Sequence, residues 1–171
     1  MRYTQRVTCL IALAITGLAP MATLAAAAAS SGGGTAHRAK GCITVTATVH
    51  FPLASFPAWV AANPKTNTIY VTESVAHTVS VISGRTNTVT ATIPLGRLPQ
   101  GVAVDPKTNT LYVANAEDNT VSVISGRTNT VTATVPVGGA PVNIAVNPNA
   151  KTIYVTNEDG NTVSVLAPCR K

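Results

Sequence analysis

The sequence predicts an all-β protein, a β-propeller built from four-stranded blades of 42 residues, with three blades in the chain. A fixed internal period and short runs of alternating apolar and polar residues lead to this fold class. The lack of any helical pattern after the N-terminal leader points the same way. Of the 171 residues, those that follow the leader are enough for one small domain.

The first 41 residues are expected to stand apart from the folded domain. Residues 1–29 are typical of a secretory signal peptide, with a short basic start, an apolar stretch and the alanine run Ala25–Ala29. If it were not cleaved, this leader would be about long enough to cross a bilayer, which is the one membrane contact that the sequence leaves open. Residues 30–41 include Ser-Ser-Gly-Gly-Gly and predict a flexible linker. We therefore expect a secreted or cell-surface protein.

Residues 42–171 carry the internal repeat. The stretch TVSVISGRTNTVTAT at 78–92 returns unchanged at 120–134, a shift of 42 residues, and prolines and tyrosines recur at the same spacing. A period of this size indicates that each unit is one supersecondary element buried against its neighbours. The expected blades cover about 57–98, 99–140 and 141–171, the last completed by a strand at 43–49.

Each unit holds four short runs in which apolar residues alternate with small polar ones. Such runs, rich in valine, isoleucine and threonine, predict strands. The segments between them are rich in Gly, Asn, Asp and Pro, the residues that accept turn geometry. In the second unit the expected strands lie at 101–104, 110–113, 120–124 and 130–135. Four strands joined by hairpins make one propeller blade.

A four-residue motif recurs in the second strand of each unit. It reads YVTN at 154–157, YVAN at 112–115 and YVTE at 70–73, each after a Pro-x-x-(Val/Ile)-Ala-x-(Asn/Asp)-Pro stretch. The chain thus resembles the YVTN-type β-propeller repeat family. The resemblance implies the architecture but not the function, because such propellers serve as surface-layer, binding and accessory proteins.

The two ends of the repeat region are expected to complement each other. The third unit has no fourth strand, whereas residues 43–49 form a fourth strand with no blade before it. Cys42 and Cys169 fall at adjacent positions of the turn that joining the ends would recreate, so we predict that they form a disulfide in the oxidising exterior. The alternative is two unpaired thiols.

Three blades are fewer than the four to eight that usually close a propeller. Two chains forming one ring would give six blades, and the cysteine bridge would then run between the subunits of a homodimer. The alternative is that the chain is a fragment of a longer propeller.

Charged residues sort to opposite ends of the expected blades. The net charge of +6 falls to +2 from Gly41 onward, so charge alone does not indicate a polyanion partner. A face that binds polyanions is one interpretation of the basic turns, and ordinary solvation of turns is the other. Nucleic acid is not favoured, since aromatic residues that would stack on bases are missing there. The basic face comprises Lys65, Arg85, Lys107, Arg127, Lys151 and Arg170.

Ligands of propellers often bind at the mouth of the central channel, where each inner strand begins. The candidates there are Trp59, Arg97, Gln100 and Asn143. Trp59 is the one tryptophan of the chain and breaks the repeat, because the equivalent positions hold Gly101 and Asn143. It is either part of a ligand site or fills a packing gap beside the connection at 49–56.

No catalytic constellation is recognisable in the sequence. The His, Cys and carboxylate residues lack metal-ligand spacing, and we expect no metal, no cofactor and no enzymatic activity. We therefore predict a non-catalytic binding or scaffolding module that contacts an unidentified ligand or a component of the cell envelope. The first alternative is an accessory or enzymatic propeller with a ligand site at the channel mouth, and the second is polyanion or nucleic-acid binding through the basic face.

Overall fold

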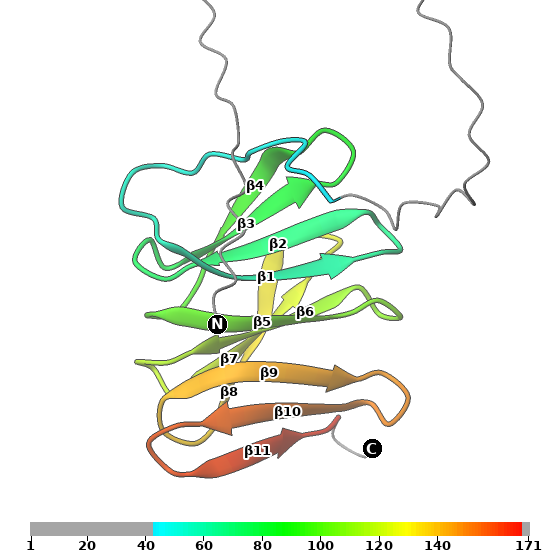
Figure 1. Ribbon diagram of the computed structural model, residues 1–171. Coiled ribbons are helices and arrows are strands. Elements are labelled where there is room, and N and C mark those ends of the chain that lie inside the picture. The colour runs from blue at the N-terminus through cyan, green and yellow to red at the C-terminus, as the bar shows by residue number, and fades with distance from the viewer. Residues whose placement is uncertain (1–42, 169–171) are drawn as a thin grey trace, which may run out of the picture. The chain divides into compact units, whose positions relative to one another are not determined.

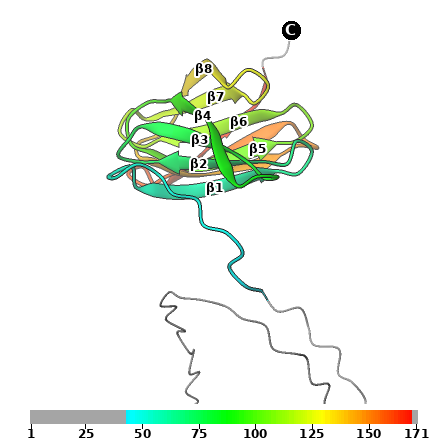
Figure 2. The same cartoon turned by 90° about the horizontal axis from the view of Figure 1, so that it is seen from above.

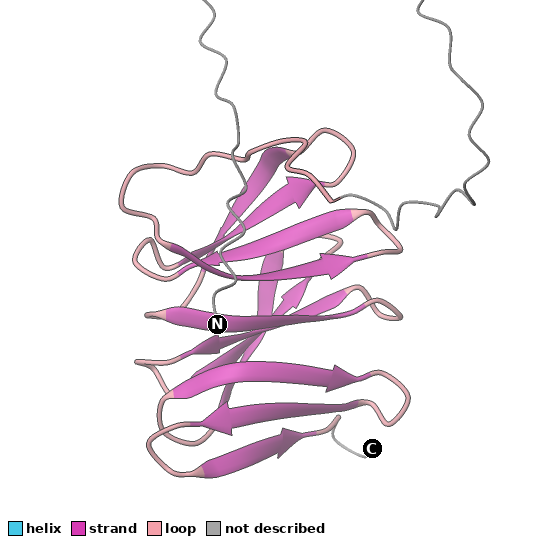
Figure 3. Cartoon of the chain, viewed as in Figure 1, coloured by secondary structure: helices cyan, strands magenta, loops and turns pink. Residues whose placement is uncertain are grey.

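The computed structural model describes residues 43–168, in which all regular secondary structure is β (Figures 1 and 3). None of these residues forms a helix long and apolar enough to cross a membrane. The eleven strands are β1 Pro57–Asn63, β2 Thr68–Glu73, β3 Thr78–Ser83, β4 Thr88–Pro94, β5 Pro99–Asp105, β6 Thr110–Asn115, β7 Thr120–Ser125, β8 Thr130–Pro136, β9 Pro141–Asn147, β10 Thr152–Asn157 and β11 Thr162–Leu166.

The strands form three antiparallel sheets in which consecutive strands are neighbours. Blade 1 has the order β1-β2-β3-β4, blade 2 the order β5-β6-β7-β8, and blade 3 the order β9-β10-β11. The innermost strand of blade 2, β5, lies between β1 and β9, so the three sheets stack face to face (Figure 1). Seen from above, along the direction of stacking, the inner strand β1 of blade 1 lies at the lower side of the picture and the outer strand β8 of blade 2 at the upper side (Figure 2). The predicted all-β fold made of propeller blades is confirmed.

The hairpins close through residues in the left-handed backbone conformation. Asn67, Asn109, Asn87 and Asn129 stand at φ between 50° and 55° at the ends of their turns. Asparagine tolerates this region better than other residues with a side chain, which explains why the repeat places it there. In blade 3 the corresponding residue of the first turn is Lys151, at φ 54°.

Apolar side chains fill the spaces between the blades. One buried cluster joins blades 1 and 2 and includes Tyr70, Val79, Ile93 and Leu111. A second joins blades 2 and 3 and includes Ala114, Val121, Ile144 and Val155. Alternation along each strand sends successive side chains to opposite faces, so blade 2 contributes to both clusters. The core is therefore made between sheets and not inside any one of them.

Residues 43–49, predicted to complete blade 3, do not do so within this chain. The segment forms no strand, and blade 3 has only three. Ile43 and Val45 are almost fully exposed, at 98% and 87%. The segment leads into β1, whereas β11 lies in blade 3, and blade 2 stands between the two. The strand predicted at 43–49 is therefore not formed in the described structure of the single chain, in which the edge of β11 is out of its reach.

Leucine-to-alanine substitutions at a buried and an exposed site measure how far stability depends on the packing between blades. Leu111 is 0% exposed between blades 1 and 2, whereas Leu53 is 100% exposed. Leu111→Ala should lower the free energy of unfolding in urea by about 2 to 5 kcal/mol, because it removes buried methyl groups and leaves a cavity. Leu53→Ala, the same chemical change, should alter it by less than about 0.5 kcal/mol. Equal effects of the two substitutions would contradict the packing described here.

Candidate functional site

The starts of the inner strands bring three polar or aromatic side chains to one place. Trp59 lies near the start of β1, Gln100 near the start of β5 and Asn143 near the start of β9, and β5 contacts both β1 and β9. Gly101 separates Gln100 from Asn143, and a side-chain carbon at Gly101 would lie 2.6 Å from the carbonyl oxygen of Val142. Only glycine lets the two strands approach this closely. We call Trp59, Gln100, Gly101 and Asn143 the mouth row.

The indole of Trp59 is held in place. Its Nε1–H donates to Gln100 Oε1 at 3.2 Å, a bond between blades 1 and 2. Its backbone N–H donates to the Thr72 hydroxyl at 3.1 Å, on the next strand of its own blade. Although fixed, the side chain is still 37% exposed. The indole thus combines a hydrogen bond to the neighbouring blade with an accessible surface.

Asn143 occupies the corresponding place in blade 3 and has the same backbone environment. Its N–H donates to the Thr156 hydroxyl at 3.1 Å, as that of Trp59 does to Thr72. Its side-chain oxygen accepts the N–H of Ile144 at 2.8 Å, and the residue is exposed. Trp59 and Asn143 therefore occupy equivalent, well-ordered positions on either side of Gly101.

Arg97, the fourth candidate for the channel mouth, is bound to the β6–β7 hairpin of blade 2. Its Nε donates to Asp118 at 2.9 Å, its backbone N–H donates to the same carboxylate at 2.7 Å, and its guanidinium lies 3.6 Å from Glu117. The backbone N–H and the guanidinium of Arg97 lower the pKa of Asp118. Arg97 therefore orders the connection between blades 1 and 2, and its charge is already neutralised.

The last residue of the four-residue motif is structural. Asn115 Nδ2 donates to the hydroxyls of Thr120 and Ser122, at 3.0 and 2.9 Å. In blade 3, Asn157 makes the equivalent bonds to Thr162 and Ser164. The motif thus joins the second strand to the third through buried hydrogen bonds.

Blade 1 departs from this pattern, since Glu73 stands in place of the asparagine. Glu73 is 3% exposed and accepts a hydrogen bond from the Ser80 hydroxyl. The equivalent of Thr120 is Thr78, whose buried hydroxyl has no partner among the described residues. The next hairpin carries His77, which also has a structural contact, because its Nδ1 accepts the N–H of Leu98 at 3.1 Å.

Within each of blades 1 and 2, the two turns that lie at the same end of the blade are joined by a backbone hydrogen bond. At one end Gly84 and Gly126 donate their N–H groups to Asn67 and Asn109, each at 2.8 Å. The described members of the basic face lie in the turns at this end, and Arg170 lies outside the described residues. Lys107 Nζ is engaged by Asn149 Oδ1 at 2.8 Å. The described basic turns thus share one end of the blades, and their role in binding stays a prediction.

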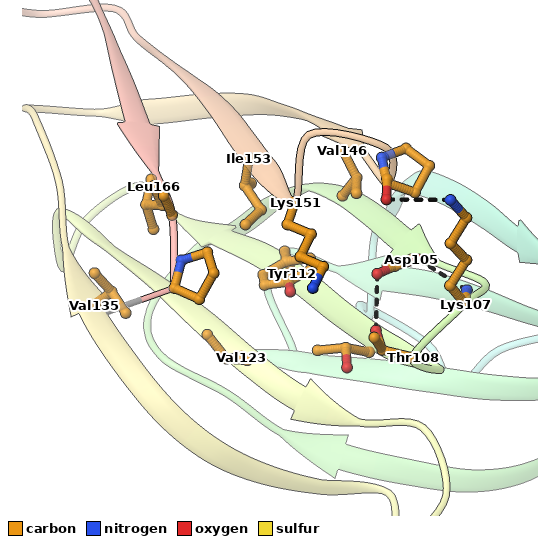
Figure 4. A pocket seen from close by; sticks show the side chains of 14 residues that line it. Asp105, Lys107, Thr108, Tyr112, Val123, Val135, Val146, Lys151, Ile153 and Leu166 are labelled. Carbon is orange, nitrogen blue, oxygen red and sulfur yellow. Dashed lines mark hydrogen bonds between the residues drawn. The ribbon is translucent and has the colours of Figure 1, made fainter. Parts of the chain in front are cut away.

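A cavity of about 440 Å³ opens between blades 2 and 3, at the basic end. Figure 4 shows Val135 and Leu166 around one part of it and Asp105 and Lys107 at the other. Burial raises the pKa of the Tyr112 hydroxyl on its wall, and the charge of Asp105 adds to this, so the phenol stays protonated at neutral pH. The sequence reasoning missed this cavity.

Two departures from the repeat mark the cavity. Between blades 1 and 2, Asn63 Nδ2 donates to Asn109 Oδ1 at 2.7 Å and joins the blades. The equivalent pair at the cavity is Asp105 and Lys151, and no direct hydrogen bond or ion pair joins them in the described part of the chain. Pro168 stands where the other units have Gly84 and Gly126. Both departures are visible in the aligned sequence units.

Two points of the sequence analysis remain, the metal-ligating residues and the features that lie outside residues 43–168. In residues 43–168 no group of three or more His, Cys, Asp and Glu side chains lies close enough to hold a metal ion. Cys42, Cys169 and the leader lie outside the described residues, so the disulfide and the signal peptide stay predictions.

Residues 18–168 match the family of YNCE-like β-propellers. No curated protein matches the chain. Among solved structures it is similar to Kuenenia stuttgartiensis hydrazine synthase, with 29% identity and a TM-score of 0.59 over 68% of this chain and 33% of that one.

Two further solved structures show the fold alone. A protein of unknown function from Desulfotomaculum acetoxidans DSM 771 is 21% identical, with a TM-score of 0.55 over 67% of this chain and 42% of that one. A putative 6-phosphogluconolactonase from Bacteroides fragilis NCTC 9343 is 18% identical, with a TM-score of 0.60 over 68% and 36%. The chain therefore spans between a third and about two fifths of the length of these proteins.

Restoring asparagine at position 73 should stabilise blade 1. In Glu73→Asn the amide can donate to Thr78 and Ser80, as Asn115 does to Thr120 and Ser122. The free energy of unfolding should rise by about 0.5 to 1.5 kcal/mol, because a buried hydroxyl gains a partner. Urea denaturation measures the change. The reverse substitution, Asn115→Glu, is the matched control and should lower stability; a stabilised N115E variant would contradict the assigned role.

The Arg97–Asp118 contact should contribute to stability only while Asp118 is ionised. The folded-state pKa of Asp118 lies below its ordinary value of 3.8. The contribution is therefore present above about pH 4 and is lost as the pH falls through the folded-state pKa. Urea midpoints of the wild type and Asp118→Asn should differ at pH 7 and converge as the pH is lowered through the folded-state pKa, which lies below 3.8. A difference that persists unchanged at low pH would show that charge is not its source.

Proposed function

Since the chain belongs to the YNCE-like β-propeller family, we propose that it acts as a non-catalytic binding or scaffolding module, secreted or held at the cell surface. The observation that carries the proposal is the mouth row, in which the indole of Trp59 is fixed by Gln100 and yet remains 37% exposed.

A fixed, half-exposed tryptophan favours recognition. Tryptophan combines a large apolar surface with a polar N–H group and is over-represented among the residues that dominate binding energy. Here the N–H is already satisfied by Gln100, so a ligand would meet mainly the apolar face of the ring. Because the ring is immobilised before binding, little further conformational entropy would be lost. Asn143, exposed on the same row, supplies an amide for a polar contact.

Export is supported by the sequence of residues 1–29, with a basic start, an apolar stretch and small residues at the expected cleavage region. A protein placed outside the cell would meet components of the envelope first. We therefore propose a cell-envelope component as the partner of the mouth row.

Binding to purified envelope material tests the proposal. The purified full chain is mixed with insoluble envelope prepared from the organism that produces it, and the bound fraction is measured by co-sedimentation. Trp59→Ala should weaken binding about tenfold or more, the effect typical of a residue at the centre of a binding site. Phe56→Ala is the matched control, since Phe56 is a nearby aromatic residue with 62% exposure. It should bind as the wild type does.

Other outcomes would point to the rival functions. Binding that is unchanged by Trp59→Ala but falls steeply with salt would overturn the mouth row and favour the basic face, because contacts to a polyanion release counterions. Chemical turnover of a bound component, detected by mass spectrometry of the supernatant, would overturn the non-catalytic assignment. Circular dichroism of each variant confirms that the fold persists.

A further inference from the structure

Blade 3 has an open edge. The third strands of blades 1 and 2 are each paired with a fourth strand, Val79 opposite Ile93 and Val121 opposite Val135. Within residues 43–168, the corresponding strand β11 is paired only with β10. An unpaired strand edge presents a row of free N–H and C=O groups that another strand can join.

The turn that follows the third strand differs in blade 3 at one of its described residues, Pro168. Gly84 and Gly126 close that turn by donating their N–H groups to Asn67 and Asn109. The equivalent residue is Pro168, which has no N–H to donate. The turn hydrogen bond that closes this hairpin in blades 1 and 2 therefore cannot form at Pro168.

Residues 44–49 have the sequence of the missing strand. They read TVTATV, identical to residues 130–135 in β8. In β8 this sequence forms a bulge, at which the Thr132 hydroxyl donates to the Val123 carbonyl oxygen of β7 at 3.1 Å. In blade 1 the hydroxyl of Thr90 in β4 donates in the same way to the carbonyl oxygen of Val81 in β3. Yet Val45 is 87% exposed and its segment pairs with no strand.

The two outer faces of the stack are also uncovered. Val121 of blade 2 is 0% exposed against blade 3, whereas its equivalent Val163 on the free face of blade 3 is 55% exposed. Val102 of blade 2 is 8% exposed against blade 1, whereas its equivalent Val60 on blade 1 is 67% exposed. The free face of blade 3 therefore repeats the face that blade 2 offers to blade 3, and the free face of blade 1 repeats the face that blade 2 offers to blade 1.

We propose that a second copy of this chain covers both surfaces, with its residues 44–49 added to β11 as the fourth strand and its blade 1 packed on blade 3. The same contacts made in return close a ring of six blades with two-fold symmetry. Six lies within the range of four to eight blades that forms closed propellers, whereas three does not. Closure covers the free faces of blades 1 and 3 in each copy and pairs the edge of each β11 with a fourth strand, as in blades 1 and 2.

The register of the added strand follows from the repeat. Transposing the β7–β8 pairing places Val49 opposite Val163, Ala47 opposite Val165 and Val45 opposite Leu166. Leu166 lines the cavity between blades 2 and 3, and its equivalent Ile124 is fully buried between blades 1 and 2. Val45 of the second copy would thus cover the part of the cavity next to Leu166.

Light scattering of the purified full chain, coupled to size exclusion, gives the first test. The expected mass is that of two chains. Val45→Lys should weaken the dimer at least tenfold, because the lysine would lie beside Leu166. Leu53→Lys is the matched control: both residues are almost fully exposed in the single chain, at 87% and 100%, but only Val45 lies in the proposed strand. A folded wild-type monomer, a larger open assembly, or equal effects of the two substitutions would overturn the proposal.

Cross-linking distinguishes exchange between copies from closure within one chain. In a background with all three native cysteines replaced by serine, one population carries Val49→Cys and the other Val163→Cys. After mixing and mild oxidation, a disulfide-linked pair containing one chain of each kind is expected. No linked pair, or a double variant that forms only an internal disulfide, would overturn the proposal. Neither experiment involves a ligand, so both are independent of the mouth row.

Discussion

A four-stranded blade has two faces, and the whole structure depends on whether each face is covered by another blade. In this chain only blade 2 lies between two neighbours, so only blade 2 contributes to both buried clusters. The energy comes from apolar area removed from water, which the alternation of side chains divides equally between the two sides of a sheet. How deeply a side chain is buried therefore depends more on the position of its blade in the stack than on its position in the repeat. Val121 and Val163 occupy the same repeat position, yet they are 0% and 55% exposed.

Within a blade, a second kind of interaction sets the strand pairing. Asn115 and Asn157 each join two hydroxyl groups of the next strand in a buried site, where an unpaired polar group would be costly. The four-residue motif that is easiest to recognise in the sequence thus stabilises the pairing of the second and third strands. This explains why the motif identifies the fold so well and says so little about a ligand, since function belongs to sites that are added to a fold.

The fold was predictable because its signals are local. Each strand and turn lies within one 42-residue unit, and the period exposes them by simple comparison. The placement of residues 43–49 was not predictable in the same way, because a strand needs a partner edge and the choice of edge depends on distant parts of the molecule. For the candidate site, the repeat brought Trp59, Gln100 and Asn143 to neighbouring strands, as expected. It did not reveal that Arg97 is neutralised by Asp118, since that contact depends on side-chain geometry.

The unchanged stretch shared by residues 78–92 and 120–134 has a consequence for how the chain reaches its native state. During folding, β4 and β8 compete almost equally for the edges of β3 and β7, because β3 and β7 are identical in sequence and the two outer strands differ only at Ile93 and Val135. Only the short turns, which keep each strand near its own partner, decide the outcome, since a nearby segment pairs faster than a distant one. When many chains are synthesised close together, the advantage of the nearby strand becomes smaller. Strands can then exchange between molecules, which is a characteristic failure of repeat proteins. Repetition that makes the blade easy to recognise thus also makes its assembly error-prone.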